Sequence, residues 1–323
     1  MLGVVALNLG GPDSLAAVEP FLRNLFADPD LIQLGWWARP VQPLLARLIA
    51  HRRAAFSRSA YAQIGGRSPI RDESLAQVQA VIRAMAAAGV AAQPYLAMSY
   101  WHPFPAETAA AMRADGITRA LLLPLYPHRS RTTSGSAFRT IEAALAGIAT
   151  ARVEGYATAP GYIEALCDRI TEALGQLPEL ERATAPVLFS AHGLPVDYIR
   201  RGDPYLDDVR STVAAVTRRL GLESRSQLAF QSRVGRQRWL APTTEEALDA
   251  LAAAGHRAVV LVPVSFTGEH LETLQEIDIL YRERAAARGI ISFARARAVG
   301  YHPAFISGLA TLLVSTARDR DWV

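Results

Sequence analysis

Residues 258–278 read AVVLVPVSFTGEHLETLQEID, and the interpretation of the whole chain can be built outward from them. Residues 258–262 are a continuous apolar run, which is typical of a strand buried on both faces of a parallel sheet. Acidic residues and a histidine follow within ten positions, at the start of a helix predicted over 268–288. Ligands in open α/β folds bind beyond the carboxyl ends of such strands. Acidic side chains near a helix N-terminus are also common as a solvated helix start, so the segment alone leaves both interpretations open.

Strand-like and helix-like segments alternate along the rest of the chain. Apolar runs at 4–9 and 187–190 each end in a glycine-containing turn, and the segments RALLLP (119–124) and RAVVLVP (257–263) resemble each other. This alternation predicts an α/β protein with parallel sheets. We expect two similar doubly wound, Rossmann-like domains, each with a parallel four-stranded sheet, and a cleft between them.

The expected domains are residues 1–178 and 179–323, and the first of them carries an insertion at about 31–70. Residues 31–53 read LIQLGWWARPVQPLLARLIAHRR, in which bulky apolar side chains are interrupted by Pro40 and Pro43 and bordered by Arg. Apolar groups with Arg at their margins suit a lip at a membrane interface. A helical hairpin that covers the core explains the same composition equally well.

Composition excludes several classes of protein. The chain has 323 residues and a net charge of +4, without a basic stripe interleaved with aromatics, so we expect no nucleic-acid partner. Its single cysteine, Cys167, excludes an internal disulfide and any site built from several cysteines. The N-terminus lacks the basic start of a signal peptide, and no run of 18 apolar residues occurs. We therefore expect a cytoplasmic protein.

Polar residues collect where the expected strands end. His192 follows a buried strand and is flanked by Gly193 and Pro195, so a short turn fixes its ring, although a single histidine in such a place is most often an ordinary polar group. His270 and Glu272 would diverge by about 160° in a regular α-helix. They can share one site only if the helix begins irregularly, for instance with a π-bulge.

Eight short motifs, taken in order, resemble the ferrochelatase family over nearly the whole chain. They are Asn8–Asp13, Tyr61–Pro69, Tyr100–Pro103, Leu123–Pro127, Ser190–Pro195, Gly202–Tyr205, Phe230–Gly235 with Trp239, and Ser265–Leu274. The resemblance implies a lyase that inserts Fe²⁺ into protoporphyrin IX, releases two pyrrole protons and completes haem synthesis.

The resemblance also implies roles for individual residues. His192 would be the base or ligand that faces the macrocycle, with Glu272 acting from the opposite side, while His270, Glu269 and Glu276 would form an acidic path for iron or protons. Imidazole and carboxylate ligands suit Fe²⁺. The implied substrate-binding positions are Leu9, Tyr126, Tyr205, Trp239 and Phe266 around the macrocycle, Arg52, Arg53 and Ser68 at its propionates, and Tyr61 and Tyr100.

The implied partners are protoporphyrin IX and Fe²⁺, and iron is a substrate. No cofactor is expected to be bound permanently, and no iron–sulfur cluster is expected because the Cys-rich tail of cluster-bearing members is absent. Residues 31–53 become a lip that makes peripheral contact with the inner face of the plasma membrane, and the protein is expected to be a monomer or homodimer. Two alternatives are a coproporphyrin III ferrochelatase and a tetrapyrrole-binding carrier without catalysis.

Overall fold

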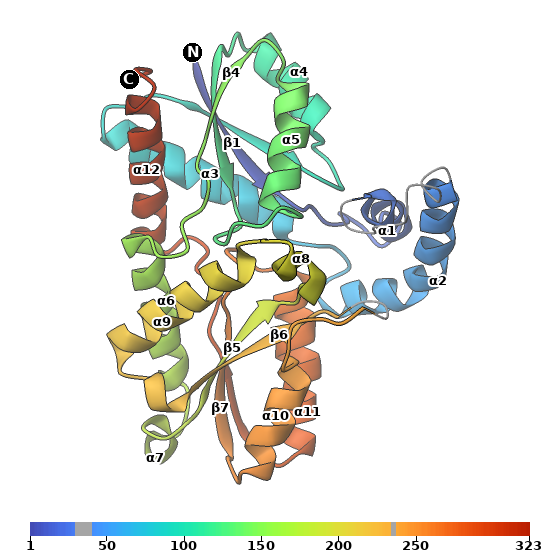
Figure 1. Ribbon diagram of the computed structural model, residues 1–323, viewed down its shortest axis with the longest axis vertical. Helices are drawn as coiled ribbons and strands as arrows, with labels where there is room; N and C mark the ends of the chain where they lie inside the picture. Colours follow the sequence, from blue (N-terminus) through green and yellow to red (C-terminus); the bar gives the residue numbers. More distant parts are fainter. Residues whose placement is uncertain (30–40, 234–236) are drawn as a thin grey trace. The chain divides into compact units, whose positions relative to one another are not determined.

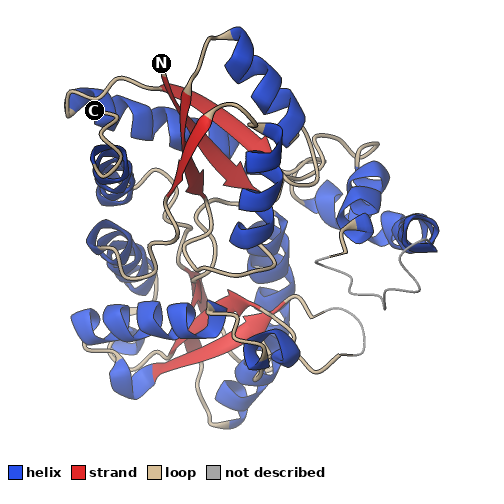
Figure 2. Ribbon diagram, turned by 45° about the horizontal axis from the view of Figure 1, so that its top comes forward, coloured by secondary structure: helices blue, strands red, loops and turns tan. Residues whose placement is uncertain are grey.

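Residues 1–29, 41–233 and 237–323 are described by a computed structural model, in which the chain forms two compact α/β units (Figures 1 and 2). The first unit contains Met1–Leu125, Arg131–Glu154 and Ala310–Val323, and the second contains Tyr126–Ser130 and Gly155–Leu309.

The first unit is built on a four-stranded parallel sheet with the strand order β2-β1-β3-β4. Its strands are β1 (Leu2–Asn8), β2 (Gln93–Met98), β3 (Arg119–Pro124) and β4 (Ala149–Arg152). Nearly every side chain of β1 and β3 is buried, which requires that both faces of the sheet be covered. The apolar runs at 4–9 and 119–124 therefore lie in the two central strands, β1 and β3.

Helices cover this sheet on its two faces. They are α3 (Ile70–Ala87), α4 (Pro105–Ala114) and α5 (Ser134–Ala144). Met112 of α4 and Phe138 and Ile141 of α5 pack with Val5 and Leu122 in one continuous apolar cluster. The helix α3 packs against β1 and β2.

Two helices, α1 (Val18–Ala27) and α2 (Gln42–Gln63), pack against each other in the first unit (Figure 1). The sequence analysis places an interruption at Pro43, but α2 is continuous from residue 42 because Pro43 stands in its first turn, where a missing backbone N–H costs no hydrogen bond. Of the expected lip at 31–53, only residues 41–53 are described, and residues 42–53 belong to α2. Trp36 and Trp37 lie outside the described residues.

The second unit repeats the plan with the strand order β6-β5-β7-β8, again with every pair parallel. Its strands are β5 (Val187–His192), β6 (Ser226–Gln231), β7 (Ala258–Pro263) and β8 (Ser292–Arg295). The expectation of two parallel four-stranded sheets is therefore confirmed. His192 and Gln231 are the last residues of the neighbouring strands β5 and β6 and pair directly in the register.

The helices of the second unit include an unusual one. Residues Glu272–Tyr281 form a π-helix, which continues into α11 (Arg282–Ala287), and Ile277 and Tyr281 from it pack with Leu188 and Leu261 in the core. The other helices are α6 (Pro160–Gly175), α7 (Glu179–Arg182), α8 (Val196–Arg200), α9 (Tyr205–Leu220), a 3₁₀ turn (Glu223–Arg225) and α10 (Thr244–Ala253). The last helix, α12 (Pro303–Arg318), begins in the second unit and continues into the first.

The two compact units depart from the expected boundary at residue 178. The helix α6 belongs to the second unit because it packs against α9 and against strands β7 and β8. Residues from Ala310 onward belong to the first unit, so the chain passes between the units more than once.

Candidate active site

A tight turn at the end of β5 presents His192. The N–H of Gly193 donates to the carbonyl oxygen of Gln231 at 2.8 Å. A Cβ atom at Gly193 would lie 2.7 Å from that oxygen and 3.1 Å from the Trp239 ring, so only glycine allows this close approach. The backbone around His192 is thus held by its neighbours independently of the imidazole.

The imidazole of His192 is paired with Glu272, the first residue of the π-helix. The Nδ1 atom of His192 lies 3.0 Å from Oε2 of Glu272, and the Nε2 atom of His270 lies 3.7 Å from the same oxygen. An ionised carboxylate only accepts hydrogen bonds, so Nδ1 of His192 carries a proton, and in the neutral imidazole Nε2 keeps its lone pair. Glu272 therefore links two histidines through one oxygen atom.

This arrangement confirms the expectation that the helix begins irregularly. His270 precedes the helix, and the residues from Glu272 onward follow π-helical rather than α-helical geometry. The side chain of Thr273 accepts a hydrogen bond from the backbone N–H of His270 at 3.0 Å, which fixes the backbone of His270. His270 and Glu272 can meet because they are not successive positions of one regular α-helix.

The second carboxylate of the cluster, Glu276, is held by groups at the end of β6. Its Oε2 atom accepts hydrogen bonds from Oγ of Ser232 at 2.8 Å and from Nε2 of Gln231 at 3.2 Å. Ser232 adopts a positive φ of 65°, which is uncommon for a residue with a side chain. Gln231 and Ser232 are missing from the site that the sequence analysis assigns, although both belong to the Phe230–Gly235 motif.

The three ionisable groups shift one another's pKa. Burial lowers the pKa of His192, but the charge and hydrogen bond of Glu272 and the charge of Glu276 outweigh it, so the pKa lies above its usual range. Burial also opposes ionisation of Glu272, yet His192 and His270 hold its pKa well below the usual range. Burial and the nearby Glu272 charge raise the pKa of Glu276 to about 7. Near neutral pH the cluster therefore combines the charged Glu272 with Glu276, whose pKa lies near 7, and with His192, whose pKa is raised.

Glu269 is engaged elsewhere. Its carboxylate accepts hydrogen bonds from Nη1 of Arg295 at 2.9 and 3.0 Å and from the backbone N–H of Ala298 at 3.0 Å. The Nε atom of Arg295 donates to Asp278 at 2.8 Å. One Arg side chain, only 8% exposed, thus binds carboxylates on both sides of the first π-helical turn.

Two of the expected aromatic residues lie near different parts of His192. The half-buried Phe266 ring lies edge-on to the His192 ring, with centroids 6.3 Å apart, and 4.5 Å from the His270 ring. Tyr205 is buried, and its hydroxyl group contacts the backbone oxygen of His192. Phe266 is thus placed beside the reactive groups, whereas Tyr205 contacts the backbone of the turn.

The remaining expected positions of the second unit are Tyr126 and Trp239, which are both half-buried. Trp239 pairs through its backbone with Pro195, so it borders the His192 turn. Burial raises the pKa of Tyr126, so its hydroxyl group stays protonated.

Six expected substrate-binding residues belong to the first unit and are described within it. Tyr61, Ser68 and Tyr100 are buried, and the Tyr100 hydroxyl group donates to Asp28. The others differ in exposure: Leu9 is half-buried, Arg52 is exposed, and the half-buried Arg53 lies over the Phe26 ring at 5.8 Å. Of the six, Leu9, Arg52 and Arg53 have side-chain surface that is open to a ligand.

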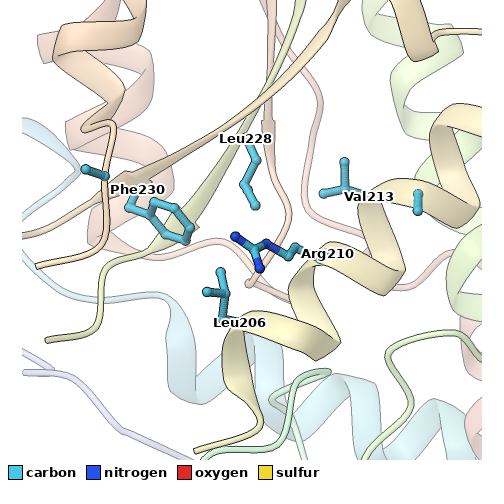
Figure 3. Close-up of a pocket in the computed structure, with 7 residues that line it drawn as sticks. Leu206, Arg210, Val213, Leu228 and Phe230 are labelled. Carbon is cyan, nitrogen blue, oxygen red and sulfur yellow. The ribbon is translucent and has the colours of Figure 1, made fainter. Parts of the chain in front are cut away.

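The described residues contain no preformed metal cage. In residues 1–29, 41–233 and 237–323, no three His, Cys, Asp or Glu side chains are arranged to hold a metal ion. A cavity of about 310 Å³ lies between α9 and β6, lined by Leu206, Arg210, Val213, Ala214, Leu228, Phe230 and Ala241 (Figure 3). It includes none of the residues expected to bind metal or porphyrin, so the His192 cluster is identified from its contacts.

Comparisons with known proteins give a consistent result. The family model described as ferrochelatase matches residues 1–317. The chain is 43% identical over 320 residues to a ferrochelatase of Gloeobacter violaceus, covering 97% of both chains. It is 44% identical over 318 residues to a ferrochelatase of Thermosynechococcus vestitus, covering 96% of this chain and 81% of the other.

Solved structures agree at the level of the fold. SirB from Bacillus subtilis, in a structure with Fe³⁺, matches with a TM-score of 0.56 and 11% identity, covering 99% of this chain and 97% of that one. CbiX, described as the terminal enzyme for siroheme biosynthesis in denitrifying bacteria, matches with a TM-score of 0.51 and 14% identity, covering 97% and 98%. At such identities the likeness concerns the fold alone.

Proposed function

The chain belongs to the ferrochelatase family, and on that premise we propose that the His192–Glu272 pair is the centre at which it inserts ferrous iron into protoporphyrin. This reaction is the terminal step of haem synthesis, and it replaces two pyrrole protons by one Fe²⁺ ion. The single observation that carries the proposal is the 3.0 Å contact between Nδ1 of His192 and Oε2 of Glu272.

The geometry supports His192 as the base. Its Nδ1–H points to Glu272, so Nε2 is the atom that accepts a pyrrole proton. The resulting imidazolium is stabilised by the adjacent carboxylate, which is the usual way in which a catalytic histidine is oriented and charged. His270 and Glu276 lie next to Glu272 and are proposed to take part in passing protons or iron. Glu269, which is paired with Arg295, is proposed to fix the start of the helix.

The proposed porphyrin-binding residues rest on different observations. Phe266 has the best support because its ring lies beside both histidines. Leu9, Tyr126 and Trp239 are half-buried and could contribute apolar surface. Arg52 and Arg53 suit propionates because a guanidinium group can bind a carboxylate through two hydrogen bonds. Tyr61, Ser68 and Tyr100 are buried, so they are proposed to support neighbouring porphyrin-binding residues of the first unit.

The pH dependence of the reaction tests the role of His192. As a base His192 must be neutral, so the rate should fall as the pH drops below its raised pKa. Glu276→Gln removes a negative charge that raises this pKa, so the acidic limb of the rate profile should move to lower pH.

The measurement is kcat/KM as a function of pH for the wild type and Glu276→Gln, because kcat/KM reports the pKa values of the free enzyme. Asp197→Asn is a suitable control because Asp197 is exposed and pairs only with Arg200 among the described ion pairs. A shift of the acidic limb to higher pH in Glu276→Gln would contradict the assignment of His192 as the base.

We further propose that α2 contacts a membrane surface. Val41, Leu44, Leu48 and Phe56 are exposed large hydrophobic residues at or on this helix, and helical spacing places them on one face together with Arg52. An apolar face that carries Arg is typical of helices that lie in the membrane interface. Among the described residues, no helix has the length and apolar character needed to cross a bilayer.

Flotation with vesicles tests the membrane contact. The wild type should float with vesicles that contain anionic phospholipid, and Leu44→Ser/Leu48→Ser should reduce the bound fraction at least about 10-fold, because each leucine loses the free energy of burying its side chain. Leu180→Ser is the matched control, since Leu180 is 94% exposed but lies on α7. Equal flotation of the wild type and the double variant would contradict the proposal.

A further inference from the structure

The hydroxyl group of Tyr205 forms a short chain of hydrogen bonds that ends at His192. Its oxygen lies 2.8 Å from the backbone oxygen of His192 and 2.7 Å from Oγ of Ser265. A phenol has one proton, and a carbonyl oxygen can only accept. Tyr205 therefore donates to His192, and Ser265 must donate to Tyr205, so the direction of the chain is fixed.

Tyr205 is itself held firmly. It is the first residue of α9, its side chain is buried, and its backbone N–H donates to Oδ1 of Asp203 at 3.0 Å. The buried His128 ring lies edge-on to the Tyr205 ring with centroids 5.9 Å apart. Because the ring and the hydroxyl group are enclosed by the protein, they leave little surface for a macrocycle.

The carbonyl group of His192 accepts a hydrogen bond from the Tyr205 hydroxyl group. The neighbouring N–H of Gly193 is bound by Gln231, and the His192 ring is bound by Glu272. Tyr205 supplies the third contact, so His192 is held at its ring, at its carbonyl group and through the N–H of Gly193. Small displacements of a catalytic group lower the rate strongly.

We propose that Tyr205, supported by Ser265, is a positioning residue for His192 rather than a wall of the porphyrin site. This inference rests on the proposed function, because it assigns a role within the same centre. Tyr205, which is expected from the sequence to contact the macrocycle, instead positions His192. Ser265, for which the sequence predicts no role, supports Tyr205.

The decisive variant is Tyr205→Phe, which keeps the ring and removes only the hydroxyl group. We expect kcat for iron insertion to fall about 10-fold while KM for the porphyrin stays within about 2-fold of the wild type. Ser265→Ala should lower kcat in the same way, whereas Ser265→Thr should retain activity because it keeps the hydroxyl group. The double variant Tyr205→Phe/Ser265→Ala should be no slower than the slower of the two single variants, because both residues act through one hydrogen-bond chain.

Tyr162→Phe is the matched control. Tyr162 is also buried, and its hydroxyl group also donates to a backbone carbonyl, that of Val264, at 2.6 Å. This variant should lose a similar amount of thermal stability but retain kcat. A wild-type kcat in Tyr205→Phe, a change confined to KM, or an equal loss of kcat in Tyr162→Phe would each overturn the inference. Failure of the proposed function has a different signature, which is insertion that survives in His192→Ala.

Discussion

Replacing His192 by alanine is expected to lower the rate of iron insertion about 1,000-fold, which lies within the range that positioned acid–base groups contribute. The variant loses the Nε2 lone pair that accepts the pyrrole proton, and it leaves Glu272 with His270 beside it. The measurement is kcat with Fe²⁺ and protoporphyrin under anaerobic conditions.

The same variant should keep its fold. The His192 side chain is 40% exposed, and the turn is held through the backbone of Gly193, so little packing is lost. Circular dichroism and thermal melting should therefore resemble those of the wild type. His102→Ala is the control for loss of a His–carboxylate pair, since His102 pairs with Glu107 at 2.8 Å in the first unit and should be dispensable for insertion. Near-normal insertion by a folded His192→Ala protein would refute the role of His192.

Arg295→Met is expected to lower the free energy of unfolding by about 3 kcal/mol, because it leaves two largely desolvated carboxylates without their cation. Arg295 is 8% exposed, while Glu269 and Asp278 are 22% and 29% exposed. The adjacent guanidinium group holds the pKa of Glu269 below its usual range against the effect of burial. Urea unfolding at neutral pH measures the loss.

The pH dependence of that loss has a definite sign. A carboxyl group whose pKa is lowered by folding stabilises the protein above its unfolded pKa, and this contribution disappears as the pH falls through the folded pKa. The difference between wild type and Arg295→Met should therefore shrink in acid. Arg297→Met is the control, because Arg297 is 62% exposed in its pair with Glu172 and should contribute less than about 1 kcal/mol. Equal effects of the two substitutions would show that Arg295 does not hold the helix.

The sheets and the place of the site could be predicted because they follow from local patterns. The apolar runs at 187–190 and 258–262 each belong to a strand in the structure, and the polar residues after them meet at one edge of the second sheet. Parallel strands bring their carboxyl ends together, so His192 and the segment that carries Glu272 could be expected at one edge of the sheet. Their direct contact at 3.0 Å could not, since Glu272 is expected to act from the opposite side. The need for an irregular helix could also be derived, since two residues separated by two positions do not face each other in an α-helix.

The partners of the individual side chains could not be predicted in this way. Glu269 reads as a further acid beside the site, but its partner Arg295 comes from β8, and the pairing depends on where that strand lies in the sheet. Tyr205 reads as an aromatic wall because the motif says nothing about which way its ring turns. Gln231 and Ser232 bind Glu276 only because the π-helix lies beside the end of β6. These contacts depend on packing between distant segments.

The central claim is that this chain inserts iron at His192 and Glu272, and the most direct test is single-turnover insertion by the purified protein. Wild type and His192→Ala are each mixed anaerobically with Fe²⁺ and an excess of protein over protoporphyrin, and the absorbance change from free porphyrin to haem is followed. The wild type is predicted to convert the porphyrin far faster than a protein-free mixture, while His192→Ala binds the porphyrin but does not convert it within the same time. Conversion at the protein-free rate by the wild type, or at the wild-type rate by His192→Ala, would contradict the claim.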